Sequence, residues 1–186
     1  MTTTVDYAGT YFKFPVLTKI HGEPTYENLH ALKNQLKSNA QSLVSNLGGG
    51  AHGHLGLVLT STEYALVSDV QYESPVHPGS LHIPSFTAQH ESIDLREEHR
   101  EKIRLFRETI DVEQALIKQI VQALDPEYLQ QLRDDVTNSI SLSLTEILKH
   151  LFDCFGKIEP DALGNEEVKV KKWFGISVIH LSQSKM

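Results

Sequence analysis

Two histidines in a glycine-rich segment are the residues of this chain whose types and spacing could do chemistry. His52 and His54 alternate within Leu-Gly-Gly-Gly-Ala-His-Gly-His-Leu-Gly, residues 47–56, so that two imidazoles could approach one metal ion. A zinc site needs three or four protein ligands, and no cysteine or carboxylate lies close by in the sequence to complete the set. We therefore predict no metal site and no cofactor, with His52 and His54 as the candidate ligands should a metal bind.

The glycines of the same segment do not form a phosphate-binding loop. A P-loop ends in Gly-Lys-Ser or Gly-Lys-Thr after a strand, and this segment has neither feature. No nucleophile-elbow or reactive-cysteine motif occurs elsewhere in the chain. The sequence therefore predicts a tight turn, where two stretches of chain pass too close for side chains, in a protein that is not an enzyme.

The clearest helical pattern lies near the C-terminal end, over residues 143–155. Ser143 and Glu146 form a capping box at its start, and Gly156 follows its last apolar residue. Cys154 is the single cysteine of the chain and lies beside the apolar face, so we expect a buried, inert thiol. The apolar residues recur every three or four positions, which places them on one face and predicts a core made of Leu144, Ile147, Leu148, Leu151, Phe152 and Phe155.

The remaining chain predicts a mostly α-helical fold with two lobes. The expected parts are an N-terminal arm or frayed terminus (1–24), an N-terminal helical lobe (25–71), a proline-rich loop (72–87), a C-terminal helical lobe (88–172) and a tail (173–186). The first lobe begins with a helix that continues to Gly48, and Thr60 with Glu63 caps a short second helix.

The C-terminal lobe is predicted to contain four helices. The first covers residues 88–107, Asp111 caps the second, Asp125 and Pro126 open the third, and Ser143 caps the fourth. Short turns between them indicate a compact antiparallel bundle.

Composition and charge exclude several classes of protein. The 186 residues carry a net charge of −7, and no apolar run is long enough to span a membrane, so we expect a soluble cytoplasmic protein. Arginines between Arg96 and Arg107 alternate with glutamates, which is typical of a solvated helix with ion pairs rather than a nucleic-acid surface. Because copies of an acidic chain repel each other less in salt, net charge alone predicts that high salt favours oligomers.

Two parts of the sequence resemble the Gag-like region of copia-type LTR retrotransposons. The first is GGGAHGHLGLVL, residues 48–59, and the second runs from Asp111 through Ile158, including ALDPEYL and LTEILKHLFDCFG. The resemblance covers about residues 17–163 and implies a helical, capsid-like structural protein that self-associates into a shell around element RNA. The zinc knuckle of that family is missing from this chain, so we expect a truncated copy whose RNA contacts depend on missing downstream sequence.

Two other functions remain open from the sequence. The same helical fold could serve as an adaptor domain that binds partner proteins without self-assembly. A metal-dependent enzyme that uses His52 and His54 ranks last, because two ligands do not complete a site.

Overall fold

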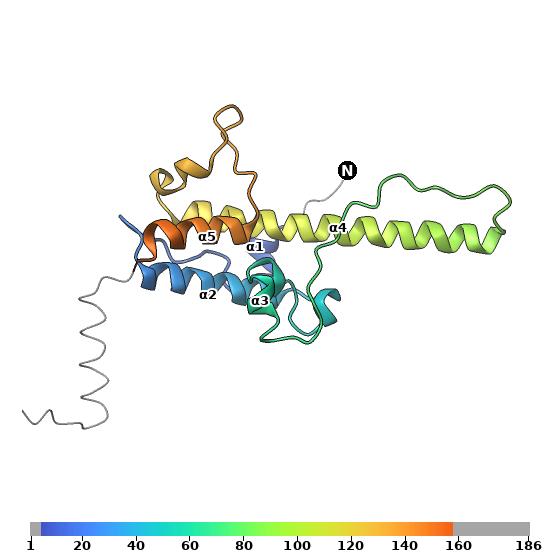
Figure 1. Ribbon diagram of the computed structural model, residues 1–186, viewed down its shortest axis with the longest axis horizontal. Coiled ribbons are helices and arrows are strands. Elements are labelled where there is room, and N and C mark those ends of the chain that lie inside the picture. Colours follow the sequence, from blue (N-terminus) through green and yellow to red (C-terminus); the bar gives the residue numbers. More distant parts are fainter. Residues whose placement is uncertain (1–4, 158–186) are drawn as a thin grey trace, which may run out of the picture.

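A computed structural model describes residues 5–157, and this part of the chain is mostly α-helical, without β-strands (Figure 1). The predicted fold class, mostly α, is confirmed. The predicted tail, residues 173–186, and the end of the predicted C-terminal lobe lie outside the described residues. Within residues 5–157, every helix is too short or too polar to cross a membrane. The elements are α1 (Tyr7–Thr10), α2 (Tyr26–Ser42), η1 (Leu47–Gly49), η2 (Leu55–Leu57), α3 (Ser61–Tyr64), α4 (Gln89–Ala123), η3 (Pro126–Leu132) and α5 (Leu144–Phe155).

The longest element, α4, joins two segments that the sequence predicted as separate helices. It has 35 residues and is about 50 Å long, and Asp111 lies exposed inside it rather than at a helix start. The chain has no glycine or proline between Ala88 and Asp125, so nothing interrupts the backbone hydrogen bonds. The predicted break at Asp111 is therefore wrong.

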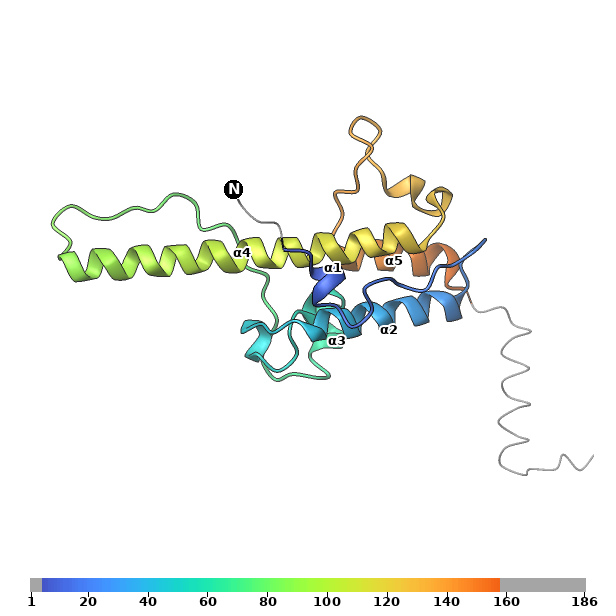
Figure 2. The same ribbon diagram turned by 180° about the vertical axis from the view of Figure 1, so that it is seen from behind.

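The core lies where α2, α5 and the C-terminal half of α4 pack together (Figure 2). The predicted core residues Leu144, Ile147, Leu148 and Leu151 are buried there. Phe152 and Phe155 are partly buried and pack against its edge. Residues from both sides of the proline-rich loop belong to this one cluster, so packing does not separate the two predicted lobes.

The described part of the N-terminal arm, residues 5–24, packs into the core rather than fraying. Phe12, Leu17 and Ile20 are buried between α2 and α4. Two buried amides hold the arm in place: Asn39 accepts from the Phe14 N–H at 2.6 Å, and Gln119 donates to the Phe14 and Pro15 carbonyls at 2.9 and 2.8 Å. Irregular backbone can be buried here because these side chains satisfy its polar groups.

The capping boxes at Thr60 with Glu63 and at Ser143 with Glu146 are both confirmed. The predicted third helix does begin at Pro126, but η3 is a 3-10 helix that ends at Leu132. The described part of the C-terminal lobe therefore contains α4, η3 and α5 instead of a four-helix bundle.

Two further predictions need correction. Helix α2 ends at Ser42, well before Gly48, because the glycine-rich segment occupies the space beyond its C-terminus. Cys154 is exposed rather than buried, on the outer side of the last turn of α5, where its Sγ lies 3.7 Å from His150 Nε2.

The N-terminal half of α4 extends beyond the core. All fully buried residues of α4 lie between Thr109 and Ala123, and none lies in residues 89–108. The proline-rich loop runs out to the tip and forms the connection to this half of the helix (Figure 1). We call residues 72–107 the protrusion.

Candidate functional site

The glycine-rich segment crosses the C-terminal end of α2 in direct backbone contact. Gly53 has a φ of +55°, and a Cβ there would lie 2.2 Å from the Leu43 carbonyl oxygen and 2.8 Å from that of Ala40. The next residue, His54, donates its backbone N–H to the Ala40 carbonyl at 2.9 Å, which satisfies one of the open carbonyls of the helix end. The predicted close passage of two chain segments is therefore confirmed.

Two tyrosines fill the spaces that the other glycines leave. A Cβ on Gly48, where φ is +56°, would lie 2.2 Å from the Tyr64 hydroxyl, which donates to the Gly48 carbonyl at 3.0 Å. A Cβ on Gly56 would lie 2.0 Å from the Tyr72 ring. The glycines thus allow Tyr64 and Tyr72 to pack flat against the backbone, with their ring centroids 5.6 Å apart.

His54 is the most deeply buried polar side chain of this region, with 1% of its surface exposed. Its Nδ1 lies 3.4 Å from the Tyr72 hydroxyl, and its Nε2 lies 3.7 Å from a carboxylate oxygen of Glu108 in α4. The second distance is too long for a hydrogen bond, and Nε2 has no hydrogen-bond partner among the described residues. We call His54, Tyr72 and Glu108 the junction cluster, because it lies where the protrusion leaves the core.

Burial sets the protonation state of the junction cluster. The loss of hydration lowers the pKa of His54, and the nearby Glu108 carboxylate opposes this shift only in part. The imidazole is therefore neutral at physiological pH. The pKa of Tyr72 is raised, first by burial and then by Tyr64 and Glu113, so this phenol stays protonated.

The two histidines of the predicted motif point to different surroundings. His52 is half-buried and places its ring edge-on to Tyr64, with 6.2 Å between the centroids, while His54 contacts Tyr72 and lies near Glu108. Among residues 5–157, no three histidine, cysteine, aspartate or glutamate side chains converge as a ligand set. The structure therefore brings His54 to a carboxylate that the sequence did not indicate, and leaves His52 outside that cluster.

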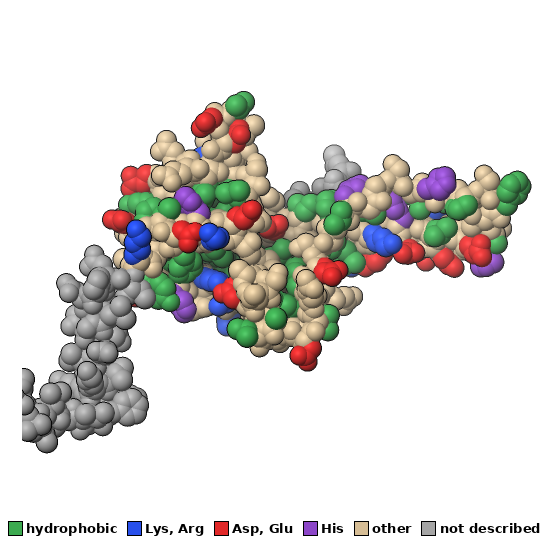
Figure 3. Space-filling model, viewed as in Figure 1, with side chains coloured by type: hydrophobic (Ala, Val, Ile, Leu, Met, Phe, Trp, Pro, Cys, Tyr) green, Lys and Arg blue, Asp and Glu red, His purple; other side chains and the backbone are tan. Residues whose placement is uncertain are grey.

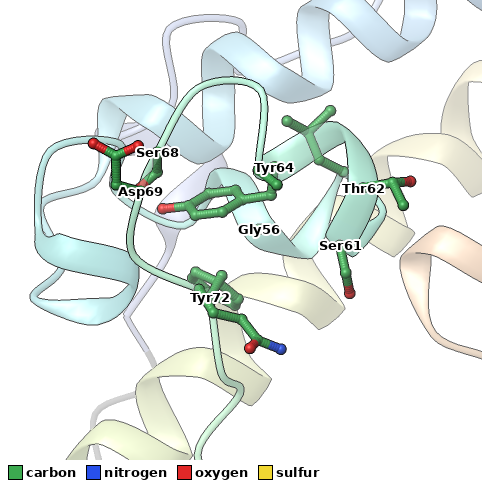
Figure 4. Close-up of a pocket in the computed structure, with 10 residues that line it drawn as sticks. Gly56, Ser61, Thr62, Tyr64, Ser68, Asp69 and Tyr72 are labelled. Carbon is green, nitrogen blue, oxygen red and sulfur yellow. The ribbon is translucent and has the colours of Figure 1, made fainter.

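A cavity of about 380 Å³ lies on the outer side of the same region (Figure 4). Ser61, Thr62, Ser68 and Asp69 lie around Tyr64 on its wall, and Tyr72 closes it toward the core. Tyr72 lines this cavity, whereas His54 does not, so the imidazole does not face the cavity. Chemically, the cavity offers hydroxyl groups, one carboxylate and the Gln71 amide beside the apolar side chains of Leu59 and Ala65.

The junction cluster continues into the protrusion through Glu108. Its second carboxylate oxygen accepts a hydrogen bond from Arg104, whose guanidinium also binds Glu101 through two bonds of 2.8 Å. Side chains of the glycine-rich segment, of the loop and of α4 thus meet at one point. The arrangement brings α4 next to the glycine-rich segment.

Sequence reasoning missed Tyr72 and Glu108, which lie far from His54 along the chain. The positions of the glycines were the available signal, since each needs a partner that fills the missing side-chain volume. Tertiary packing decides which aromatic residue fills it, and it also places Glu108 beside His54 without any signal from the glycines.

Comparison of the chain with models of known protein families, with curated proteins and with solved structures found no match.

Proposed function

We propose that this chain is a structural protein that acts by associating with copies of itself, and that the assembly is the shell of a copia-type retrotransposon. The proposal includes a cytoplasmic location and no enzymatic activity of the chain itself. Element RNA would be bound by sequence outside this chain. The motifs at residues 48–59 and from Asp111 onward support the family, and the protrusion supports the mode of action.

The protrusion is the observation that carries the proposal. Residues 89–108 of α4 add no fully buried side chain to the core, although they make up more than half of this helix. Most of the stability of a helix in a protein comes from packing of its side chains, so a contact partner would stabilise this segment. Large apolar side chains of the protrusion are left exposed: Val76, Leu81, Phe86 and Ile93.

Phe86 shows that the tip is held in an unusual form. It has a φ of +71°, which is strained for an aromatic residue, and its side chain is fully exposed. Aromatic side chains are enriched in protein interfaces, where they bury large areas. A surface of this kind supports binding of protein.

The test is the molecular mass of the purified, nucleic-acid-free chain over a wide range of concentration, by sedimentation equilibrium and light scattering. We expect a mass above that of one chain that increases with concentration. A chain that stays monomeric over the whole range would contradict self-association. That result would favour the second candidate, an adaptor domain that uses the same protrusion for a different protein.

A further inference from the structure

Helix α4 carries two oppositely charged faces in the protrusion. The exposed arginines Arg96, Arg100 and Arg107 fall within about 40° of one another around the helix, at 100° per residue. The acidic face points about 160° away from them. It consists of the exposed residues Glu91, Asp94, Glu98 and Glu101. Acidic side chains gather along one edge of the protrusion in Figure 3.

The third face of the same helix is apolar and already covered. Its partly buried residues lie on the side of the loop: Leu95, His99, Ile103 and Phe106. The loop residue His77 places its ring edge-on to Phe106, with 5.1 Å between the centroids. The two charged faces therefore remain available for a partner, together with the exposed Ile93.

Most of the arginine charge of α4 forms no ion pair within residues 5–157. Among residues 5–157, Arg96, Arg100 and Arg107 have no ion-pair partner. On the acidic face, Asp94 is also without an ion-pair partner in this part, whereas Glu98 is paired with Lys102 at 2.7 Å and Glu101 with Arg104 at 2.8 Å. Within the described part of the chain, one face thus offers three unpaired guanidinium groups, and the other keeps a net negative charge.

We propose that copies of the chain associate through their protrusions, with the arginine face of one copy against the acidic face of the next. This inference rests on the proposed self-association and names its surface. The two faces point away from each other on one rigid helix, so they cannot satisfy each other within one molecule. They can do so only between copies.

The charge of the whole chain favours the protrusion as the meeting point. Five acidic and five basic side chains lie between Gln89 and Arg107, so this segment is neutral in a chain with a net charge of −7. Copies that approach through the protrusions meet the least repulsion.

A contact between two different faces has a structural consequence. Each bound copy still presents one free face, so the contact is heterologous and continues into a ring or an open array. A two-fold contact would instead close at a dimer. The proposed shell requires the continuing kind.

The sign of the salt dependence tests the surface. An arginine–carboxylate contact weakens as salt shortens the Debye length from about 10 Å at 0.1 M to about 3 Å at 1 M. The net charge alone predicts the opposite trend. We expect the association of the unmodified chain to weaken by at least about tenfold between low and molar salt. Oligomers that strengthen with salt would overturn the proposed surface and leave self-association intact.

Charge reversal gives the second test. The arginine-face variant carries Arg96→Glu, Arg100→Glu and Arg107→Glu, and the acid-face variant carries Asp94→Lys and Glu98→Lys. Each variant alone presents like charges on both faces and should associate at least about tenfold more weakly than the unmodified chain. An equimolar mixture should recover association, because the altered faces complement each other. A merely structural effect would not be rescued by mixing, so a mixture that stays dissociated overturns the inference.

A matched control reverses three exposed lysines outside the protrusion, with Lys118→Glu, Lys149→Glu and Lys157→Glu. It changes the net charge as much as the arginine-face variant does and should associate more strongly than that variant. Circular dichroism must show equal helix content in all variants. Association that disappears after nuclease treatment would show that the arginines bind nucleic acid, and would also overturn the inference. A chain that is monomeric throughout refutes the proposed function itself.

Discussion

Gly53 provides the sharpest test of the close contact between the glycine-rich segment and α2. Substitution by alanine adds a Cβ that would lie 2.2 Å from the Leu43 carbonyl oxygen, a distance that real Cβ atoms do not show. The φ of +55° adds a separate strain of about 1–2 kcal/mol for any residue with a Cβ. The two effects can be separated because another glycine has the strain without the contact.

Gly22 is the matched control. Its φ is +74°, and a Cβ there would have no atom within 4 Å. It lies in the arm close to the buried Ile20, so backbone strain at Gly22 also lowers the stability of the packed core. Gly22→Ala should therefore lower the free energy of unfolding by about 1–2 kcal/mol.

Gly53→Ala must also displace backbone from the end of α2. The hydrogen bond from the His54 N–H to the Ala40 carbonyl is then lost or stretched, which removes about 1 kcal/mol more. Packing of the buried neighbours Leu55 and Leu57 is disturbed as well. We expect a total loss of about 4 kcal/mol.

The measurement is urea unfolding followed by far-ultraviolet circular dichroism. At a slope of about 2 kcal/mol per molar urea, the midpoint should fall by about 2 M for Gly53→Ala and by less than about 1 M for Gly22→Ala. Equal midpoints for the two variants would refute the close contact and leave only the backbone strain.

Three further predictions concern the core and the junction cluster. Leu151→Asp places a carboxylate at a position with 0% exposure and should unfold the chain, whereas Val136→Asp, at 91% exposure, should leave the thermal melt unchanged. Gln119→Leu removes the hydrogen bonds that Gln119 donates to the Phe14 and Pro15 carbonyls and the one that it accepts from Asn39, and should lower the free energy of unfolding by about 2–4 kcal/mol; Gln122→Leu on the exposed side should change it by less than about 0.5 kcal/mol in the same urea assay. Burial lowers the pKa of His54 below its unfolded value of about 6.5, so on acidification the unfolded chain binds the extra proton first. The contribution of the neutral imidazole to the free energy of unfolding is therefore fully present above about pH 6.5. It falls as the pH decreases from there toward the folded pKa. The difference in unfolding free energy between the unmodified chain and His54→Gln should therefore shrink between about pH 7.5 and pH 5.5, and parallel pH profiles would contradict a neutral, buried His54.

Local signals in the sequence predicted the helix starts well. The capping boxes at Thr60 and Ser143 each satisfy backbone groups within one turn, so they depend only on neighbouring residues. The apolar face of α5 was predicted for the same reason, since its spacing is fixed by the helix itself.

Tertiary contacts decided what the sequence did not reveal. Asp111 with Gln114 has the spacing of a capping box, which predicts a helix start. Thr109, Val112 and Leu116, however, are buried at the three- and four-residue spacing of one continuous helix face, and this packing favours an unbroken helix. The arm has no helical period, and its buried backbone is instead satisfied by Asn39 and Gln119 from other elements. Periodicity cannot report contacts of that kind.

The continuity of α4 determines what the charged faces can do. A break at Asp111 would have let the protrusion pivot against the core, and the directions of the two faces would then vary from copy to copy. In the unbroken helix, the same backbone that buries Val112 and Leu116 also fixes the rotation of Arg100 and Glu98 about the axis. The contact between Glu108 and Arg104 lies at the point where the helix leaves the core, next to His54. Every copy therefore presents its arginine and acidic faces at the same angle to its own core, which is the condition for a contact that repeats in one direction to build a regular array.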